Sequence, residues 1–281
     1  MAKRFNAVIR RPNRRIRRNT GRKGLRNFLF SKLSAILLLL LVVATGSSYY
    51  FFASDKFLIK NIVIEGASPS IERDVRSYIA GFLESKMLFI LKPDKVTLFP
   101  ESKISRDLVS ELPRIKEARV QIIHPDALKI EIIERTEHGI WCDYAVSVPL
   151  CYFYDSEGVI YQTAPNSVKG SLITPLRDKR GIDHGLGSEV VGQDIIDFTD
   201  KLAEALRFAY EKPFYISIED NEEIRAGFSS GWEARFSMNN PVLESVENLI
   251  LVIEEEIGIN ARELEYMDLR LGNKVFYKYK E

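Results

Sequence analysis

The chain has 281 residues, with 40 basic and 39 acidic side chains, so its net charge at neutral pH is only +1. This balance hides two regions of opposite charge. Residues 1–32 carry twelve Lys or Arg and no acid, which leaves 28 basic against 39 acidic residues, or −11, in the remainder. The two cysteines, with no His pair nearby, do not complete a tetrahedral zinc site and exclude a disulfide-rich scaffold.

The basic tail, residues 1–32, has few apolar side chains, and six of the nine residues from Arg10 to Arg18 are Arg. Such a segment cannot bury enough surface to offset its ordering entropy, so we expect it to be disordered. Its charge favours attraction to anionic lipid and a cytoplasmic position. Nucleic-acid binding is the alternative, but no aromatic residues alternate with the basic ones to stack on bases, so no nucleic-acid partner is expected.

Residues 33–54 contain no charged side chain. A helix of that length rises about 33 Å, enough to cross a hydrocarbon core of about 30 Å. The segment therefore predicts a transmembrane helix with the tail inside and residues 55–281 on the exterior face of the cell membrane, which makes membrane lipid a partner of both span and tail. A cleaved signal peptide and a buried core helix are the alternatives.

Residues 57–135 alternate between strand and helix patterns in a defined order. The β-branched run 57–66 predicts a strand, and helices follow at 70–79, where Gly81 supplies a stop, and at 101–112. Alternating apolar residues at 118–123 and 128–135 predict two further strands. This order, βααββ, predicts two helices on one face of a three-stranded sheet.

Residues 136–281 show mostly strand patterns, with two amphipathic helices, and predict a mostly antiparallel β domain. Asn240 and Pro241 are expected to cap and open the second helix, which should run to Gly258. Pro175 suggests that 172–176 is an edge strand. The overall fold class is α+β after an N-terminal transmembrane helix, with strands expected at 139–143, 148–154, 159–161, 172–176, 214–219, 223–228, 232–237, 264–269 and 274–279 and helices at 195–209 and 240–258.

Cys142 and Cys151 lie in the two arms of one predicted hairpin. Outside the cytoplasm, facing strands allow them to form a disulfide. The alternative is a pair of free thiols in a small apolar patch.

No constellation of catalytic residues stands out. His124, His138 and His184 lie in separate segments, and no metal or cofactor motif is present. The run Gly227–Gly231 fits the G-x-S-x-G pattern around Ser229, but strand-like sequence lies on both sides and no His follows, so we expect a hairpin turn. The acidic run 254–256 reads as a solvated helix end, and the loop around His184 as a flexible surface loop. We therefore expect no catalytic residue, no metal and no cofactor, and no enzyme.

Four segments, in this order, resemble the FtsQ/DivIB family of bacterial cell-division proteins. Residues 57–66 are similar to the opening strand of that family's POTRA domain, and 120–135 to its closing hairpin. Trp141 with 154–161 resembles the start of the family's β domain, and 266–270 its C-terminal signature. The resemblance divides the chain into a tail (1–32), a span (33–54), a POTRA-like domain (57–135) and a β domain (136–281).

The resemblance implies a non-enzymatic scaffold that links early and late division proteins at the septum. Its POTRA-like domain would bind other divisome components, and its last strand would bind coiled-coil partners of the FtsL and FtsB/DivIC type. A terminal strand has a free row of backbone groups, so an extended partner can add beside it. In the alternative, alternate residues fill the core and the lysines only protect the edge. The implied partner-binding residues are Arg270, Lys274, Val275, Phe276, Tyr277, Lys278 and Tyr279.

Two departures from the family pattern are visible: Leu271 follows Arg270 where an aromatic residue is expected, and the Cys142/Cys151 pair is not a general family feature. A different functional class is a membrane-anchored exterior enzyme acting on cell-wall polymer, which would need a deep cleft with convergent carboxylates or a His. A third is a POTRA-bearing transport component, although no β-barrel sequence follows.

Overall fold

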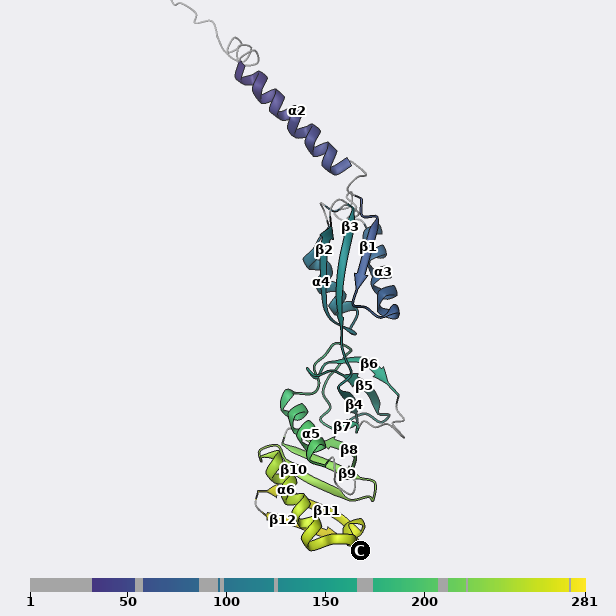
Figure 1. Cartoon of the computed structure of the whole chain (residues 1–281), viewed down its shortest axis with the longest axis vertical. Coiled ribbons are helices and arrows are strands. Elements are labelled where there is room, and N and C mark those ends of the chain that lie inside the picture. The colour runs from purple at the N-terminus through teal and green to yellow at the C-terminus, as the bar shows by residue number, and fades with distance from the viewer. Residues whose placement is uncertain are drawn as a thin grey trace, which may run out of the picture. The chain divides into compact units, whose positions relative to one another are not determined.

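The computed structural model describes residues 32–53, 58–85, 96, 99–123, 126–165, 174–206, 212–220, 222–272 and 274–281. The chain divides into two compact units, Met1–Leu58 and Ile59–Glu281. Among the described residues the fold is α+β, with five α-helices and two sheets of three and nine strands (Figure 1).

The first unit contains helix α2, Lys32–Ala53. Within the described part of the chain, no helix is both long enough and apolar enough to cross a membrane. The predictions of a transmembrane helix over 33–54 and of a single-pass membrane protein with an inside tail and exterior domains are therefore wrong. The uninterrupted run Ile36–Val43 rises only about 12 Å, and Thr45 then places its hydroxyl on the carbonyl oxygens of Leu41 and Val42 at 2.8 and 3.1 Å. Residues 1–31 of the predicted disordered tail lie outside the described residues.

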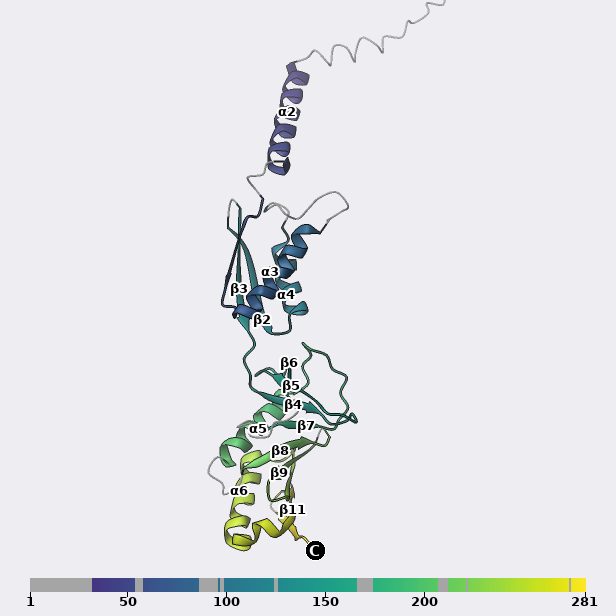
Figure 2. The same ribbon diagram turned by 90° about the vertical axis from the view of Figure 1, so that its right-hand side faces the viewer.

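The second unit begins with a βααββ module, residues 59–135. Its elements are β1 (Asn61–Glu65), α3 (Pro69–Glu84), α4 (Glu101–Glu111), β2 (Ile115–Ile123) and β3 (Ala127–Glu134). The sheet order is β1-β3-β2, with β1 parallel and β2 antiparallel to β3. Both helices lie on one face of this sheet (Figures 1 and 2). Their buried stripes meet the sheet through Ile71, Val75, Ile79, Ile104, Leu108, Leu128, Ile130 and Ile132.

The spacing of Ile71, Val75 and Ile79 places these fully buried side chains on one stripe of α3. The helix continues through Gly81 to Glu84, so the predicted stop at Gly81 is wrong. A Cβ added at Gly81 would lie more than 4 Å from any neighbouring atom, so Gly81 is at an open surface position and no close contact requires glycine there. Gly66, by contrast, has φ +80° and lies so near Ile132 O that a Cβ would come within 2.2 Å.

A nine-stranded module follows. Its strands are β4 (Gly139–Asp143), β5 (Leu150–Tyr154), β6 (Ile160–Ala164), β7 (Leu176–Asp178), β8 (Pro213–Ile218), β9 (Glu223–Phe228), β10 (Glu233–Ser237), β11 (Leu264–Leu271) and β12 (Lys274–Tyr279). The sheet order is β12-β11-β10-β9-β8-β7-β4-β5-β6. Five neighbouring pairs are antiparallel, and the pairs β10–β11, β4–β7 and β7–β8 are parallel.

Helices α5 (Gln193–Ala205) and α6 (Val242–Val252) pack on the same face of this sheet (Figure 2). Helix α6 continues as a π-helical turn, η4 (Ile253–Ile257), and a 3-10 segment, η5 (Gly258–Glu263). The core between helices and sheet contains Trp141, Ile196, Phe198, Leu202, Ile216, Ala234, Phe236, Val246, Leu249 and Met267.

Two local predictions in this module are wrong. Strand β7 is not an edge strand, because it lies between β4 and β8. Pro175 lies just before the strand, so β7 itself contains no residue that lacks a backbone N–H. The carbonyl of Pro175 still takes part in the sheet, since it accepts the N–H of Ile216 at 3.0 Å. Asn240 does not cap α6. Pro241 occupies the capping position, and the Asn240 amide instead donates to the carbonyl of Arg270 at 3.1 Å. Leu172 and Ile173 of the predicted strand lie outside the described residues.

Candidate partner-binding edge strand

Strand β12 forms one edge of the nine-stranded sheet and pairs antiparallel with β11 alone among the described strands. Met267 lies opposite Tyr277, and Asp268 lies opposite Phe276. Both register irregularities of this pair add a residue to β11, so β12 itself alternates regularly. The edge that faces away from β11 is therefore a continuous stretch of backbone.

The direction of the free backbone groups follows from one hydrogen bond. The N–H of Lys280 donates to the carbonyl of Glu263, across the pair Tyr279–Leu264, at 2.8 Å. Because amide direction alternates along a strand, the N–H groups of Val275, Tyr277 and Tyr279 point away from β11. These three residues present both their N–H and C=O groups to the open edge, in the pattern that an added strand requires.

The side chains of β12 expose apolar area beside that edge. Phe276 is 51% exposed, Tyr277 40% and Tyr279 37%. The rings of Tyr277 and Tyr279 meet edge to face at 5.7 Å, while Val275 packs partly into the core. Val275 therefore helps to fill the core, while the three aromatic side chains remain partly exposed, and partner binding by this strand stays a prediction.

The charged residues of the predicted site are largely engaged within the chain. Arg270 binds Asp268 at 2.5 Å and Glu223 of β9 at 2.6 Å. These bonds raise the pKa of Arg270 and lower that of Asp268. Lys278 binds Glu265 at 2.6 Å, a hydrogen bond that raises the lysine pKa. Arg270 thus ties the β11–β12 hairpin to β9, and Lys274 is the lysine of β12 that has no ion pair among the described residues.

The other three strand edges are covered, at least in part, by hydrogen bonds. On β2, the N–H groups of Val120 and Ile122 donate to Ser105 Oγ and Glu101 Oε1 of α4, at 3.2 and 2.8 Å. On β1, the carbonyl of Ile62 accepts from Arg76 Nη1 of α3 at 3.2 Å.

On β6, Ile160 forms two backbone hydrogen bonds with the loop 187–188. The N–H of Ile160 donates to the carbonyl of Ser188 at 3.0 Å, and the carbonyl of Ile160 accepts the N–H of Gly187 at 2.7 Å. Within the described residues, no side chain or loop is hydrogen-bonded to the outer edge of β12. Such capping is how proteins close sheet edges to added strands, and β12 is the edge on which the described residues show none.

Cys142 and Cys151 lie directly opposite each other on β4 and β5, with their Cα atoms 4.0 Å apart and their sulfur atoms joined in a disulfide. Both are buried with Ile140, Phe153 and Ala164 in a small cluster of their own. The disulfide joins β4 to the neighbouring strand β5.

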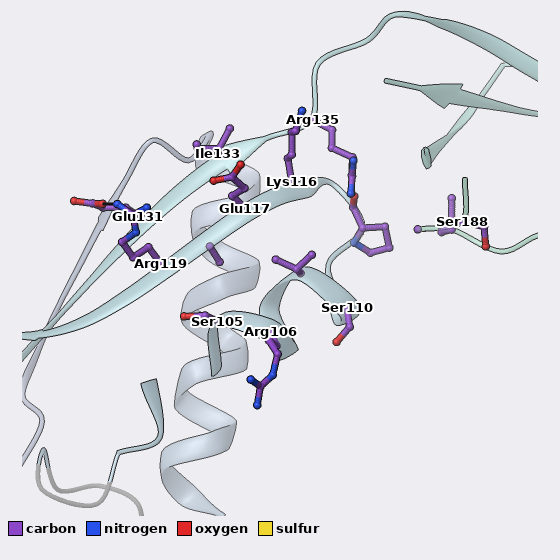
Figure 3. Close-up of a pocket in the computed structure, with 15 residues that line it drawn as sticks. Ser105, Arg106, Ser110, Lys116, Glu117, Arg119, Glu131, Ile133, Arg135 and Ser188 are labelled. Carbon is purple, nitrogen blue, oxygen red and sulfur yellow. Dashed lines mark hydrogen bonds and ion pairs between the residues drawn. The ribbon is translucent and has the colours of Figure 1, made fainter. Parts of the chain in front are cut away.

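A groove of about 820 Å³ lies between α4, the β2–β3 hairpin and the loop 186–188 (Figure 3). Two carboxylates line it, Glu117 and Glu131. Glu131 lies 2.8 Å from Lys129 and 3.9 Å from Arg119, and its pKa is lowered, first by the hydrogen bond from Lys129. A general acid needs the opposite shift, so Glu131 does not have the raised pKa that acid–base chemistry would use.

The remaining chemical candidates of the sequence are held in structural contacts. Ser229 lies in the turn between β9 and the antiparallel β10, a strand–turn–strand context that lacks the helix of a nucleophile elbow. His184 packs edge-on against Trp141 at 4.8 Å, and His138 lies 3.2 Å from Asp200. His124 lies outside the described residues.

Sequence reasoning missed the residues that shape the edges. Lys280 reaches back from the end of β12 to the carbonyls of Ser230 and Arg262, at 2.8 and 3.2 Å. Glu101 and Ser105 cap β2 from the first turns of α4. The position of Glu101 in the first turn of a helix was a signal for a role at the helix dipole, but not for a bond to a distant strand.

No protein-family model matches the chain, and a search of curated proteins finds no match.

Proposed function

We propose that this chain is a non-enzymatic scaffold of the FtsQ/DivIB type, which links bacterial cell-division proteins to one another. Its β12 edge binds an extended segment of a coiled-coil partner of the FtsL or FtsB/DivIC type by strand addition, and its βααββ module binds other division proteins. The supporting observation is the contrast between edges: β1, β2 and β6 are each partly covered by hydrogen bonds, and the described residues show no such bond on the outer edge of β12.

The division of labour within β12 supports the same proposal. Outward backbone groups at Val275, Tyr277 and Tyr279 supply hydrogen bonds, and the exposed rings of Phe276 and Tyr277 supply apolar area. In strand addition, main-chain bonds provide affinity and alternate side chains provide specificity. Lys274, which has no ion pair among the described residues, suits a partner strand with an acidic side chain opposite it.

Two variants of one residue test the backbone contribution. Tyr277→Pro removes an outward N–H but no bond to β11, and proline is tolerated on the solvent side of an edge strand. Tyr277→Ala removes the ring and keeps the N–H. We expect Tyr277→Pro to abolish capture of an FtsL/FtsB-type pair, and Tyr277→Ala to weaken it by about tenfold.

The measurement is the dissociation constant of the full chain for the purified pair, with the circular dichroism spectrum and Tm as folding checks. Equal affinities for the proline and alanine variants would show that the backbone edge is not used. No binding by the unmodified chain would remove the proposed function altogether.

A further inference from the structure

A second apolar feature lies at the same end of the sheet as the end of β12. It is a pocket of about 510 Å³, here called the C-terminal pocket, between the end of α6, segment η5 and the β9–β10 turn. Its volume falls within the range of sites that hold a small ligand or a side-chain anchor. Its walls include Phe228, Trp232, Ile250, Ile253, Ile259 and Ala261.

The backbone is irregular where it forms the wall of the pocket. Helix α6 widens into a π-helical turn, and the chain then reverses at Gly258, with φ +57°. Segment η5 follows this reversal and lines the pocket together with the buried side chains of Phe228 and Trp232. Ile259, at the rim, is 96% exposed. Irregular helical turns of this kind are frequent at functional sites.

The pocket is joined to the β12 edge by Lys280. Its Nζ bonds Ser230 O, in the turn between Phe228 and Trp232, and also Arg262 O in η5. The end of the edge strand is thus tied to both sides of the pocket. Because strands β9 to β12 are neighbours in the sheet, a strand added beside β12 lies about three inter-strand spacings, or roughly 14 Å, from β10. About four or five extended residues cover that distance.

We infer that the partner segment that pairs with β12 continues past Lys280 and places an apolar side chain, such as Leu or Phe, in the C-terminal pocket. This inference rests on the proposed strand addition at β12. The occupant belongs to the same partner chain, because the lysine bridge makes the pocket continuous with that edge. Recognition is then bipartite: backbone pairing sets the register, and the apolar anchor distinguishes this partner from other extended segments.

Photo-crosslinking of the full chain tests the contact directly. Benzoylphenylalanine is placed at Ile259 or, as control, at Leu243, which is 55% exposed on α6 and does not line the pocket. With an FtsL/FtsB-type pair as probe, we expect a crosslink from position 259 to a partner residue a few positions from the paired strand, and none from position 243.

Affinity provides a second readout. Ala261→Trp fills the pocket with a larger side chain. Ile259→Lys places a charge at the rim of the pocket, and because Ile259 is almost fully exposed, this change should not affect folding. We expect each to raise Kd about tenfold, and Leu243→Lys to leave it unchanged. Wild-type affinity in both pocket variants and no crosslink, while Tyr277→Pro still abolishes binding, would overturn the pocket inference alone. Loss of all binding by the unmodified chain would overturn the proposed function as well.

Discussion

Arg135 shows how a single side chain holds the two modules of the second unit together. Its guanidinium forms an ion pair with Asp155 and donates through Nε to the carbonyl of Pro113 at 3.2 Å. The side chains of Arg135 and Asp155 are only 11% and 3% exposed. Asp155 Oδ1 also accepts the N–H groups of Glu157 and Val159, so the carboxylate is fully used.

Replacing Arg135 should therefore be costly. Arg135→Ala leaves the buried Asp155 carboxylate without its counter-charge, and we expect a loss of about 3 kcal/mol in the free energy of unfolding. Urea denaturation followed by circular dichroism measures this loss. The control is Arg119→Ala, whose side chain is 70% exposed and 3.9 Å from Glu131; its expected effect is below about 0.5 kcal/mol. Similar midpoints for the two variants would contradict the assigned role of Arg135.

At the scale of elements, the most informative contrast is between covered and open strands. Helix α4 covers the edge of β2 with two side chains, Glu101 and Ser105, while also burying Ile104 and Leu108 in the core. One helix thus packs the module and closes its edge. Strand β12 has no equivalent among the described residues, since α6 packs over the sheet face and leaves the outer edge free.

Removing a cap should expose the β2 edge. Glu101→Ala leaves the partly buried N–H of Ile122 without its acceptor, and we expect a cost of about 1–2 kcal/mol together with faster hydrogen exchange at Ile122. Glu101→Gln keeps an oxygen acceptor and should retain most of the protection. Unchanged exchange at Ile122 in the alanine variant would show that Glu101 is not the cap.

The β4–β5 hairpin offers a second test at this scale. The disulfide joins residues nine positions apart, and closing a loop of that size stabilises by roughly 2–3 kcal/mol in the chain-entropy model. A Cys142→Ala, Cys151→Ala double variant should show a lower Tm by calorimetry, and reduction of the unmodified chain should give the same shift. A Tm that is insensitive to both changes would rule out a stabilising role.

For the whole molecule, the buried and bridged carboxylates determine how stability depends on pH. Burial alone would raise the pKa of Asp178, which is 1% exposed, but hydrogen bonds from Arg180 and Trp141 outweigh it and lower the pKa. The pKa of Asp268 is lowered chiefly by its bond to Arg270. Groups of this kind stabilise the fold above their unfolded pKa of about 4, and the stabilisation is lost as pH falls through the folded value.

The free energy of unfolding should therefore change little between pH 7 and about pH 5 and fall below about pH 4. Asp178→Asn should lower stability at pH 7 and make the acid-induced fall shallower, because one proton fewer is taken up on unfolding. Urea denaturation at a series of pH values provides the curve. A variant curve parallel to that of the unmodified chain would mean that Asp178 does not contribute to the acid transition.

Local periodicity was sufficient to identify most elements. Alternation at 128–134 and helical spacing at Ile71, Val75 and Ile79 indicated which side chains face the core, and β12 has the expected bounds, Lys274–Tyr279. A run of apolar residues was a weaker guide: residues 33–53 lie in helix α2, but the described residues contain no helix able to cross a membrane. Periodicity reports burial on one face of an element, and this information is local.

The neighbours of each strand were decided only by the tertiary structure. The residues around Pro175 do not indicate that β7 lies between β4 and β8. Likewise, the sequence around Glu101 does not indicate that its carboxylate accepts the N–H of Ile122. Strand order, edge capping and the pocket at the end of α6 depend on contacts between residues far apart in the chain, whose free energy is set by packing in three dimensions. The sequence alone therefore determined where β12 begins and ends, and the fold decided that its outer edge is the open one.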